Sequence, residues 1–367
     1  MNTNIEYKQS GVSFPIFFDR IKGKVVTVFC DVNTAIYAKN IVKEIEKYAK
    51  KVVYLEFPDK DLVPSQEVVD TVLKNCENSN YALAVGSGSL NDVCKLVGTT
   101  LNIDCGCLAT AASMDGYLSK GSAIMRNGKK VTDVVKTPTD ILVDLEIIKN
   151  APRIMTAAGF GDIIGKYTCM TDWQLSNIIN GEEINQEAFN LMLEARSACV
   201  DAFNDLVLYK AEAVAKLMNA LLTAGTSMAI CGNSRPASGS EHHQSHFLEM
   251  DFVARGETIP AHGIKVAIGT LVSIELYNYL KDNNVQFKNN QEVFKLVDNL
   301  PKVETVKYML EKMGCPTKFG DIGVRREVMI DMLKNAHTVR DRYTILTLIN
   351  ELNLTEQVIP VIMAKYF

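Results

Sequence analysis

Four of the five histidines in this chain fall within one short stretch, and histidine is the commonest transition-metal side-chain ligand. They are His242, His243, His246 and His262. A neutral imidazole nitrogen donates to a metal without having to lose a proton near pH 7. His242 and His246 stand four residues apart, so a helix places both on one face. The stretch predicts a metal site, and two imidazoles leave that site incomplete until another segment supplies a carboxylate.

The carboxylate candidate is Asp162, in the upstream motif GFGD. Apolar residues at Ile163, Ile164, Tyr167 and Met170 follow it at helical spacing, so we expect Asp162 near the start of a helix. One carboxylate and two imidazoles leave coordination positions open for a substrate oxygen. Catalytic metal sites need such an open position, and closed structural sites lack it.

The motifs GFGD and SRPASGSEHHQSH and the later HG together resemble the metal-binding part of the iron-containing (metal-dependent) alcohol dehydrogenase superfamily. The nearest branch is the bacterial sn-glycerol-1-phosphate dehydrogenases, and the resemblance covers almost the whole chain. It implies that Asp162, His242 and His262 bind one divalent metal ion, zinc or alternatively nickel or iron(II), with Asp162 also facing the substrate. His246 shares the ligand face one turn further along, where it would bind substrate, relay a proton or support the ligands. We expect packing or solvent contacts for His243, and an ordinary helix-end position for His337.

Composition limits the possible partners and the compartment. The 367 residues suit two domains, and a net charge of −4 gives no basic field for nucleic acid. The N-terminus has no apolar signal-peptide core. The most membrane-like run, Ala213 to Gly232, contains Lys216 and Asn219, which favours a buried helix and no membrane association. The nine scattered cysteines indicate reduced thiols and a cytoplasmic protein.

Residues 1–150 alternate apolar strand-like runs with amphipathic helical ones, which predicts an α/β domain built on a mostly parallel sheet. The predicted strands are Lys24 to Cys30, Val52 to Phe57, Tyr81 to Val85, Cys107 to Thr110 and Ile141 to Val143. Asn127-Gly128 stands between two further strand-like runs and predicts a hairpin.

A glycine-rich turn follows the third predicted strand and precedes a helix. Such a turn lets backbone N–H groups approach a pyrophosphate. However, Asn91 stands where the dinucleotide fingerprint has a glycine. A plain strand–helix turn is therefore an equal alternative. The resemblance identifies GSGSLND as the nucleotide loop of a Rossmann-like dinucleotide-binding domain. The cofactor-binding residues in it are Gly86, Ser87, Gly88, Ser89 and Asp92. Asp31, at the end of the first strand, would bind the adenosine ribose, or else is a solvated turn residue. The cofactor can therefore be either NAD(H) or NADP(H).

The segment Thr110 to Ser119 also follows a predicted strand. The resemblance places it beside the nicotinamide and the substrate. It assigns hydroxyl contacts with the cofactor to Thr110, Ser113 and Ser119, and a catalytic contact with the substrate hydroxyl to Asp115. Ordinary turn chemistry at Asp115-Gly116 is the alternative.

From residue 151 to residue 367 almost every run has helical periodicity, which predicts an all-α bundle of about seven to nine helices. We expect the metal ligands to project from separate helices or helix ends into the cleft between the two domains, since such clefts are favoured binding places.

The parts together predict a dehydrogenase. The resemblance implies reduction of dihydroxyacetone phosphate to sn-glycerol 1-phosphate, with the metal as a Lewis acid and the nicotinamide as hydride donor. Arg235, before the histidine cluster, is the predicted phosphate ligand; a salt bridge at the helix entry is its alternative.

Three other functions remain open. A glycerol or other polyol dehydrogenase would share the fold and the metal, and a sugar-phosphate cyclase like dehydroquinate synthase would use NAD only transiently. A non-catalytic metal- or nucleotide-binding protein is the third. The resemblance also implies a homodimer acting on a small-molecule substrate, a triose phosphate or a polyol.

Overall fold

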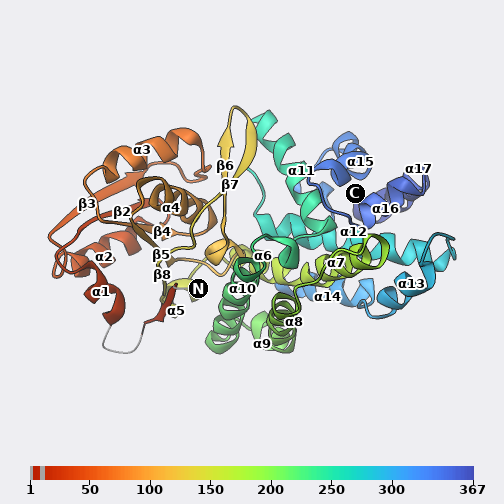
Figure 1. Cartoon of the computed structure of the whole chain (residues 1–367), viewed down its shortest axis with the longest axis horizontal. Helices are drawn as coiled ribbons and strands as arrows, with labels where there is room; N and C mark the ends of the chain where they lie inside the picture. The colour runs from red at the N-terminus through yellow and green to blue at the C-terminus, as the bar shows by residue number, and fades with distance from the viewer. Residues whose placement is uncertain (1–2, 9–12) are drawn as a thin grey trace. The chain divides into compact units, whose positions relative to one another are not determined.

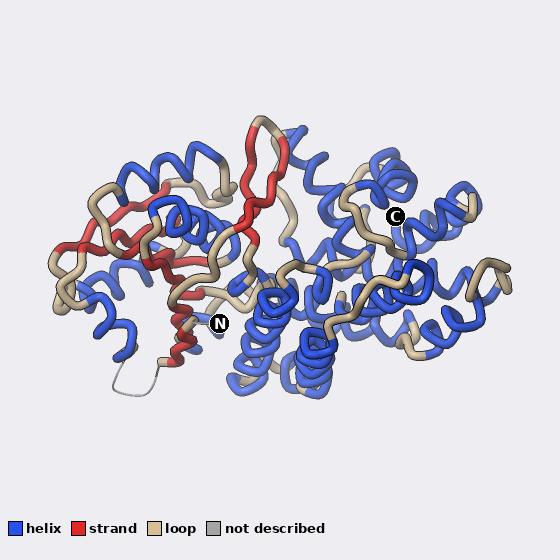
Figure 2. Tube along the Cα trace, viewed as in Figure 1, coloured by secondary structure: helices blue, strands red, loops and turns tan. Residues whose placement is uncertain are grey.

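The computed structural model describes residues 3–8 and 13–367, which fall into two compact units. The first unit comprises the described residues up to Ala112 together with Gly116–Pro152. The second comprises Ser113–Asp115 and Arg153–Phe367. Figure 1 labels their helices and strands, and Figure 2 shows that the described strands belong to the first unit, while the second is built from helices and loops.

The first unit is built on a six-stranded sheet in the order β1-β8-β5-β4-β2-β3, and every neighbouring pair is parallel. Its strands are β1 (Asn4–Tyr7), β2 (Val25–Asp31), β3 (Lys51–Phe57), β4 (Tyr81–Gly86), β5 (Asp104–Ala109) and β8 (Asp140–Val143). β4 and β5 are buried almost throughout, as expected for central strands of a sheet covered on both faces. The α/β class predicted from the sequence is confirmed.

Helices cover both faces of this sheet. They are α1 (Pro15–Ile21), α2 (Ala35–Ile45), α3 (Gln66–Cys76), α4 (Gly88–Leu101) and α5 (Leu145–Lys149), with a 3-10 turn η1 (Gly116–Leu118). Phe17 of α1 and Ile41 of α2 share one core with Val28 and Leu83 of the sheet. Figure 1 shows α3 and α4 on the opposite face. Because side chains alternate along a strand, each central strand supplies apolar residues to both cores.

The predicted hairpin is present as β6 (Gly121–Arg126) and β7 (Lys129–Val134), which pair antiparallel. Asn127 and Gly128 join them with φ angles of 51° and 71°. A two-residue hairpin turn needs this left-handed backbone at both positions, and asparagine followed by glycine adopts it at low cost.

The second unit is helical, and its described residues hold twelve α-helices where the periodicity predicted seven to nine. They are α6 (Arg153–Ile164), α7 (Lys166–Asn180), α8 (Gln186–Asp201), α9 (Phe203–Val207), α10 (Ala211–Cys231), α11 (Ser240–Arg255), α12 (His262–Asp282), α13 (Asn290–Asp298), α14 (Val303–Met313), α15 (Arg326–Asn335), α16 (Ile345–Glu351) and α17 (Thr355–Tyr366). Short 3-10 turns are η2 (Arg235–Ala237), η3 (Gly320–Ile322) and η4 (Ala336–Thr338). Part of the excess comes from short separate helices such as α9, which has five residues and begins two residues after α8 ends.

Two long helices organise this unit. α12 is buried around its circumference and packs against α6, α11, α14, α16 and α17. α10 is long and apolar enough to cross a membrane by length and composition, but 61% of its most apolar window is buried within the protein, where it packs against α8 and α6. α10 is therefore a core helix, as its lysine and asparagine predicted.

Candidate metal centre

Three helices of the second unit bring Asp162, His242 and His262 together. One possible ligand atom from each lies within 4.8 Å of those of the other two. Asp162 is at the end of α6, His242 in the first turn of α11, and His262 is the first residue of α12. The side chains of Asp162 and His242 are buried, while that of His262 is 26% exposed. The cluster (the Asp–His–His trio below) is therefore enclosed on most sides and open on one.

The expectation that Asp162 starts a helix is wrong. The apolar periodicity that follows it runs through two helices, because only Gly165 separates α6 from α7. Asp162 lies in the last turn of the first of these helices.

A close contact between two helix backbones positions this carboxylate. A Cβ atom on Gly161 would stand 2.6 Å from the carbonyl oxygen of Gly263, and one on Gly263 would stand 1.8 Å from that of Ala158. Only glycine at both places lets α6 and α12 approach this closely. Since Asp162 and His262 are the neighbours of these glycines, the same contact brings the two predicted ligands together.

Carboxylates behind the imidazoles fix their orientation. Nδ1 of His242 lies 2.7 Å from Oε1 of Glu241, and Glu241 also accepts hydrogen bonds from Thr168 Oγ1 at 2.6 Å and the backbone N–H of Gly239 at 2.7 Å. Burial would raise the pKa of Glu241, but His242 and the other donors hold it below its usual value. An ionised Glu241 only accepts, so Nδ1 of His242 donates to it and Nε2 is left with a lone pair for a metal. Metal-binding histidines characteristically have such a carboxylate partner.

The site also contains a buried lysine, Lys166, which was not predicted from the sequence. Lys166 is fully buried, and its Nζ donates to Asp115 Oδ2 at 2.5 Å, to Asp162 Oδ1 at 3.0 Å and to the carbonyl oxygen of Ala237 at 2.9 Å. Burial alone would lower the pKa of Lys166, and the two carboxylates raise it above its usual value instead. For Asp162 burial would raise the pKa, and Lys166 together with His242 holds it well below its usual range. Asp162 is thus ionised, as a metal ligand must be.

Asp115 lies beside the trio, as predicted. Its backbone N–H donates to Asp162 Oδ2 at 3.0 Å, and its side chain is held by Lys166. The segment Ser113–Asp115 packs with the second unit for this reason, although the chain on either side of it belongs to the first. Ser113 is buried there.

His246 also lies next to the trio. Its ring centroid is 5.6 Å from that of His262 and 6.2 Å from that of His242. Its Nδ1 lies 3.2 Å from Glu249 Oε2, which fixes the ring. His243 is fully buried, and burial lowers its pKa to about 3, so it is a neutral packing residue as expected.

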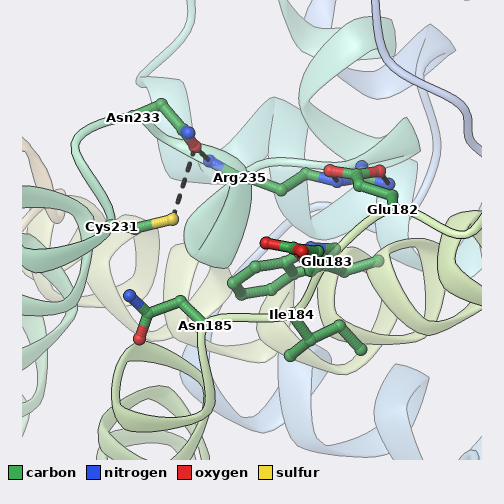
Figure 3. A pocket seen from close by; sticks show the side chains of 8 residues that line it. Glu182, Glu183, Ile184, Asn185, Cys231, Asn233 and Arg235 are labelled. Carbon is green, nitrogen blue, oxygen red and sulfur yellow. Dashed lines mark hydrogen bonds and ion pairs between the residues drawn. The ribbon is translucent and has the colours of Figure 1, made fainter.

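Arg235 does not face the trio. Its guanidinium group donates to both carboxylate oxygens of Glu182 at 3.0 Å and to the carbonyl oxygens of Asp172 and Tyr343. Figure 3 shows Arg235 and Glu182 side by side at a hollow of about 320 Å³ whose lining residues include no member of the trio. These contacts favour the salt-bridge alternative for Arg235 over the predicted phosphate contact.

Asp172 holds this part of the unit together. It is fully buried and accepts hydrogen bonds from Tyr277 Oη at 2.7 Å and from the backbone N–H groups of Ser240 at 2.7 Å and Ile345 at 2.8 Å. One carboxylate thereby ties α7 to the starts of α11 and α16 and to α12. The sequence suggested no role for Asp172.

The predicted nucleotide loop lies in the first unit, where β4 ends at Gly86 and α4 begins at Gly88. Ser87 is the N-cap residue, and Ser89 lies in the first turn of a helix of 14 residues. A helix start of this kind offers unpaired N–H groups and a positive dipole end to a phosphate.

Four other predicted cofactor residues have clear structural contacts. Asp92 accepts hydrogen bonds from the backbone of Ala123 at 3.0 Å and pairs with Lys95 at 2.9 Å. Lys95 is fully buried and also donates to Ser119 Oγ at 3.1 Å. Asp31 accepts from the backbone of Asn33 and Thr34 at 2.9 and 3.0 Å, which makes it a turn residue at the end of β2. Thr110 is buried and continues the sheet register through its N–H.

The donor set fits a divalent transition metal. It offers one ionised carboxylate and two imidazoles, and neighbouring groups control the orientation of the imidazoles. One side of the cluster is open to solvent. Catalytic zinc sites have this combination of ligands and an open position. The fold and this site together define an iron-containing alcohol dehydrogenase. The family model described as iron-containing alcohol dehydrogenase matches residues 12–152.

Comparison with curated protein sequences identifies the branch of the family to which the chain belongs. The chain is 34% identical over 288 residues to glycerol-1-phosphate dehydrogenase (NAD(P)+) of Bacillus velezensis, covering 77% of this chain and 73% of that protein. It is 30% identical to the enzyme of the same name from Bacillus subtilis, covering 94% of this chain and 90% of that one. The chain belongs to the glycerol-1-phosphate dehydrogenase family.

A solved structure with the same fold is that of a probable glycerol dehydrogenase from Sinorhizobium meliloti. It superposes with a TM-score of 0.73 at 18% identity and covers 99% of this chain and 97% of that one. At this identity the likeness shows the fold and no more.

Proposed function

We propose that this protein reduces dihydroxyacetone phosphate to sn-glycerol 1-phosphate with NADH or NADPH, in a reversible hydride transfer. The observation that carries the proposal is the Asp–His–His trio, held by three helices in a chain about 30% identical to glycerol-1-phosphate dehydrogenases along most of its length. The same family membership implies a nicotinamide cofactor and a divalent metal.

Asp162, His242 and His262 would hold the metal. When bound, the metal supplies Lewis-acid polarisation of the substrate carbonyl and the nicotinamide supplies the hydride. We assign the metal as zinc, with nickel and iron(II) as alternatives, since a carboxylate and two imidazoles suit all three.

The residues around the trio would orient the substrate. Asp115, fixed by Lys166 at 2.5 Å, would accept a hydrogen bond from a substrate hydroxyl, so its side chain sets the position of the reacting carbon. His246, next to His262, would contact the substrate and deliver the proton to the product oxygen. Replacing His246 by asparagine separates these roles: a lost proton relay changes the pH profile of kcat, and a lost contact raises KM alone.

The first unit would bind the nicotinamide cofactor. We propose that the pyrophosphate lies at the start of α4, on the N–H groups of the turn Gly86 to Ser89, with Thr110, Ser113 and Ser119 near the rest of the cofactor. The turn contacts of Asp31 leave its preference between NADH and NADPH to measurement.

We further propose a cytoplasmic homodimer. All nine cysteines are free, and eight of them are buried, which suits a reducing compartment. Light scattering of the purified protein tests the dimer directly, since the mass of one chain is 40.6 kDa.

The test is turnover by metal-depleted protein that is reloaded separately with zinc, nickel or iron(II). Dihydroxyacetone phosphate and dihydroxyacetone are compared side by side, with NADH and with NADPH. Fast turnover of the phosphorylated ketone alone supports the proposal. Turnover of dihydroxyacetone in its place assigns the protein to glycerol dehydrogenases, and no turnover with any metal contradicts a redox function.

A further inference from the structure

Two arginines converge on one serine hydroxyl near the trio. Arg340 and Arg342 lie in the segment between η4 and α16. Nη1 of Arg340 donates to Ser234 Oγ at 3.0 Å, and Nη2 of Arg342 donates to the same oxygen at 2.9 Å. A hydroxyl oxygen accepts two hydrogen bonds and keeps its own O–H free to donate. The two guanidinium groups are thus held around the hydroxyl of Ser234, whose O–H group is directed away from both of them.

Within residues 3–8 and 13–367 no carboxylate forms a direct ion pair with either arginine, although the charge of Glu249 stabilises Arg340 and that of Glu182 stabilises Arg342 from further away. Their remaining described contacts are with a ring nitrogen and a backbone carbonyl: Arg340 Nη2 lies 3.4 Å from Nε2 of His246, and Arg342 Nη1 lies 3.2 Å from the carbonyl oxygen of Ser238. Arg235, the residue directly after Ser234 in the chain, is instead paired with Glu182.

The pair is also poorly solvated. Burial lowers the pKa of Arg340, and burial together with the charge of Arg340 lowers the pKa of Arg342 to about 10. Two shielded like charges without a counter-ion cost free energy in the folded state. A protein keeps such an arrangement most readily where a bound anion offsets the cost.

The position of the pair relative to the trio suits a triose phosphate. His246 contacts Arg340 on one side, and its ring centroid lies 5.6 Å from that of His262 on the other. One imidazole therefore separates Arg340 from the metal ligands. In dihydroxyacetone phosphate one methylene and one ester oxygen separate the carbonyl carbon from the phosphorus. A substrate with its carbonyl oxygen at the trio would extend its phosphate past His246 towards this pair.

We propose that Arg340 and Arg342, with the hydroxyl of Ser234, bind the phosphate group of the substrate and select phosphorylated over unphosphorylated ketones. This inference rests on the proposed function and replaces Arg235 as the phosphate ligand. The guanidinium forks offer paired N–H donors to the phosphate oxygens, and Ser234 adds an O–H donor while it still accepts from both arginines.

The test compares the variants R340Q, R342Q and R340Q/R342Q with the wild type, all loaded with zinc. The control is R325Q/R326Q, which removes the same charge from two adjacent exposed arginines. We expect kcat/KM for dihydroxyacetone phosphate to fall by about 10- to 100-fold in each single variant, since charge-assisted hydrogen bonds are lost. Turnover of dihydroxyacetone should stay within about twofold of wild type in R342Q, whose side chain has no described contact with His246. The control variant should match wild type with both ketones. Equal losses with both ketones, or no loss with the phosphorylated one, would overturn the proposal.

A binding measurement separates this inference from the proposed function. Inorganic phosphate should raise the Tm of the metal-free wild type and of R325Q/R326Q, and leave that of R340Q/R342Q unchanged, whatever the enzyme's substrate proves to be. A phosphate-dependent rise that persists in R340Q/R342Q contradicts the site. If the glutamine variants do not fold, R340K/R342K takes their place, because lysine keeps the charge but lacks the paired N–H donors of a guanidinium group. The expected result for that variant is weaker phosphate binding than wild type, and undiminished binding would also contradict the proposal.

Discussion

Two charged regions of the helical unit differ in the sign of the charge that they leave uncompensated. Around the trio, the buried carboxylates of Asp115 and Asp162 share the ammonium of Lys166, and that of Glu241 pairs with His242. Around Ser234, two guanidinium groups form no direct ion pair with a carboxylate in the described part of the chain, and only the more distant charges of Glu249 and Glu182 act on them. The first region is therefore complementary to a cation and the second to an anion. A metal ion and a substrate phosphate would compensate the two regions separately.

The largest expected effect is loss of the cation site. Replacing Asp162 with asparagine removes the anionic ligand, so bound metal should fall to background and kcat by on the order of 1,000-fold. Elemental analysis of the purified protein measures the first and turnover the second. The control is H337A, which removes a histidine outside the trio. A D162N protein that keeps one metal ion per chain would contradict the ligand assignment.

Removing the ammonium group of Lys166 should increase the net negative charge of the first region. In K166M the carboxylates of Asp115 and Asp162 lose the ammonium that lies between them, so the free energy of unfolding of the metal-free protein should fall by about 3–5 kcal/mol. Added zinc should restore part of this loss, because the metal then compensates the charge of Asp162. Urea unfolding with and without zinc measures both. K210M, which removes an exposed lysine paired with Asp205, should leave the stability close to that of the wild type, because a solvent-exposed ion pair contributes little.

The carboxylate behind His242 should affect metal binding without abolishing it. E241Q keeps the shape of the side chain but weakens the hydrogen bond to Nδ1 of His242, so zinc affinity should fall by about 10- to 100-fold. Competition with a chelator measures this affinity. E194Q, at an exposed position of α8, serves as the control. Equal zinc affinity in E241Q and wild type would mean that Glu241 does not orient the ligand.

The smallest effect on catalysis is expected at Arg235, whose charge is already compensated by Glu182. R235Q should lower the Tm, because it breaks a largely buried ion pair, and should leave KM for dihydroxyacetone phosphate within about twofold of wild type. A rise in KM of tenfold or more with an unchanged Tm would return the phosphate role to Arg235.

Features local in the sequence were predictable. The alternation of strands and helices gave the α/β class, and Asn127-Gly128 gave the hairpin. The family resemblance carried by GFGD, SRPASGSEHHQSH and the later HG pointed to three residues that the structure brings together, whereas the spacing alone had singled out His242 and His246. Each of these signals needs only a few neighbouring residues, because it reflects helix or strand periodicity or a short motif.

Features that depend on distant packing were not predictable. Arg340 meets Ser234 across 106 positions of the chain, and nothing in the local pattern KNAHTVRDRY marks it. Lys166 stands four residues after Asp162, a spacing that places both on one helix face, but its other partner, Asp115, lies 51 positions away and nothing local marks the contact. Arg235 looked suitable as a phosphate ligand because its neighbours were known and its partner Glu182, 53 positions away, was not.

The most direct test of the central claim offers the zinc-loaded protein pure sn-glycerol 1-phosphate, pure sn-glycerol 3-phosphate and glycerol, each with NAD and with NADP, and follows formation of the reduced cofactor. The account predicts reduction with sn-glycerol 1-phosphate and none with its mirror image or with glycerol. Reduction with glycerol in place of the phosphate ester, or with sn-glycerol 3-phosphate, would contradict it.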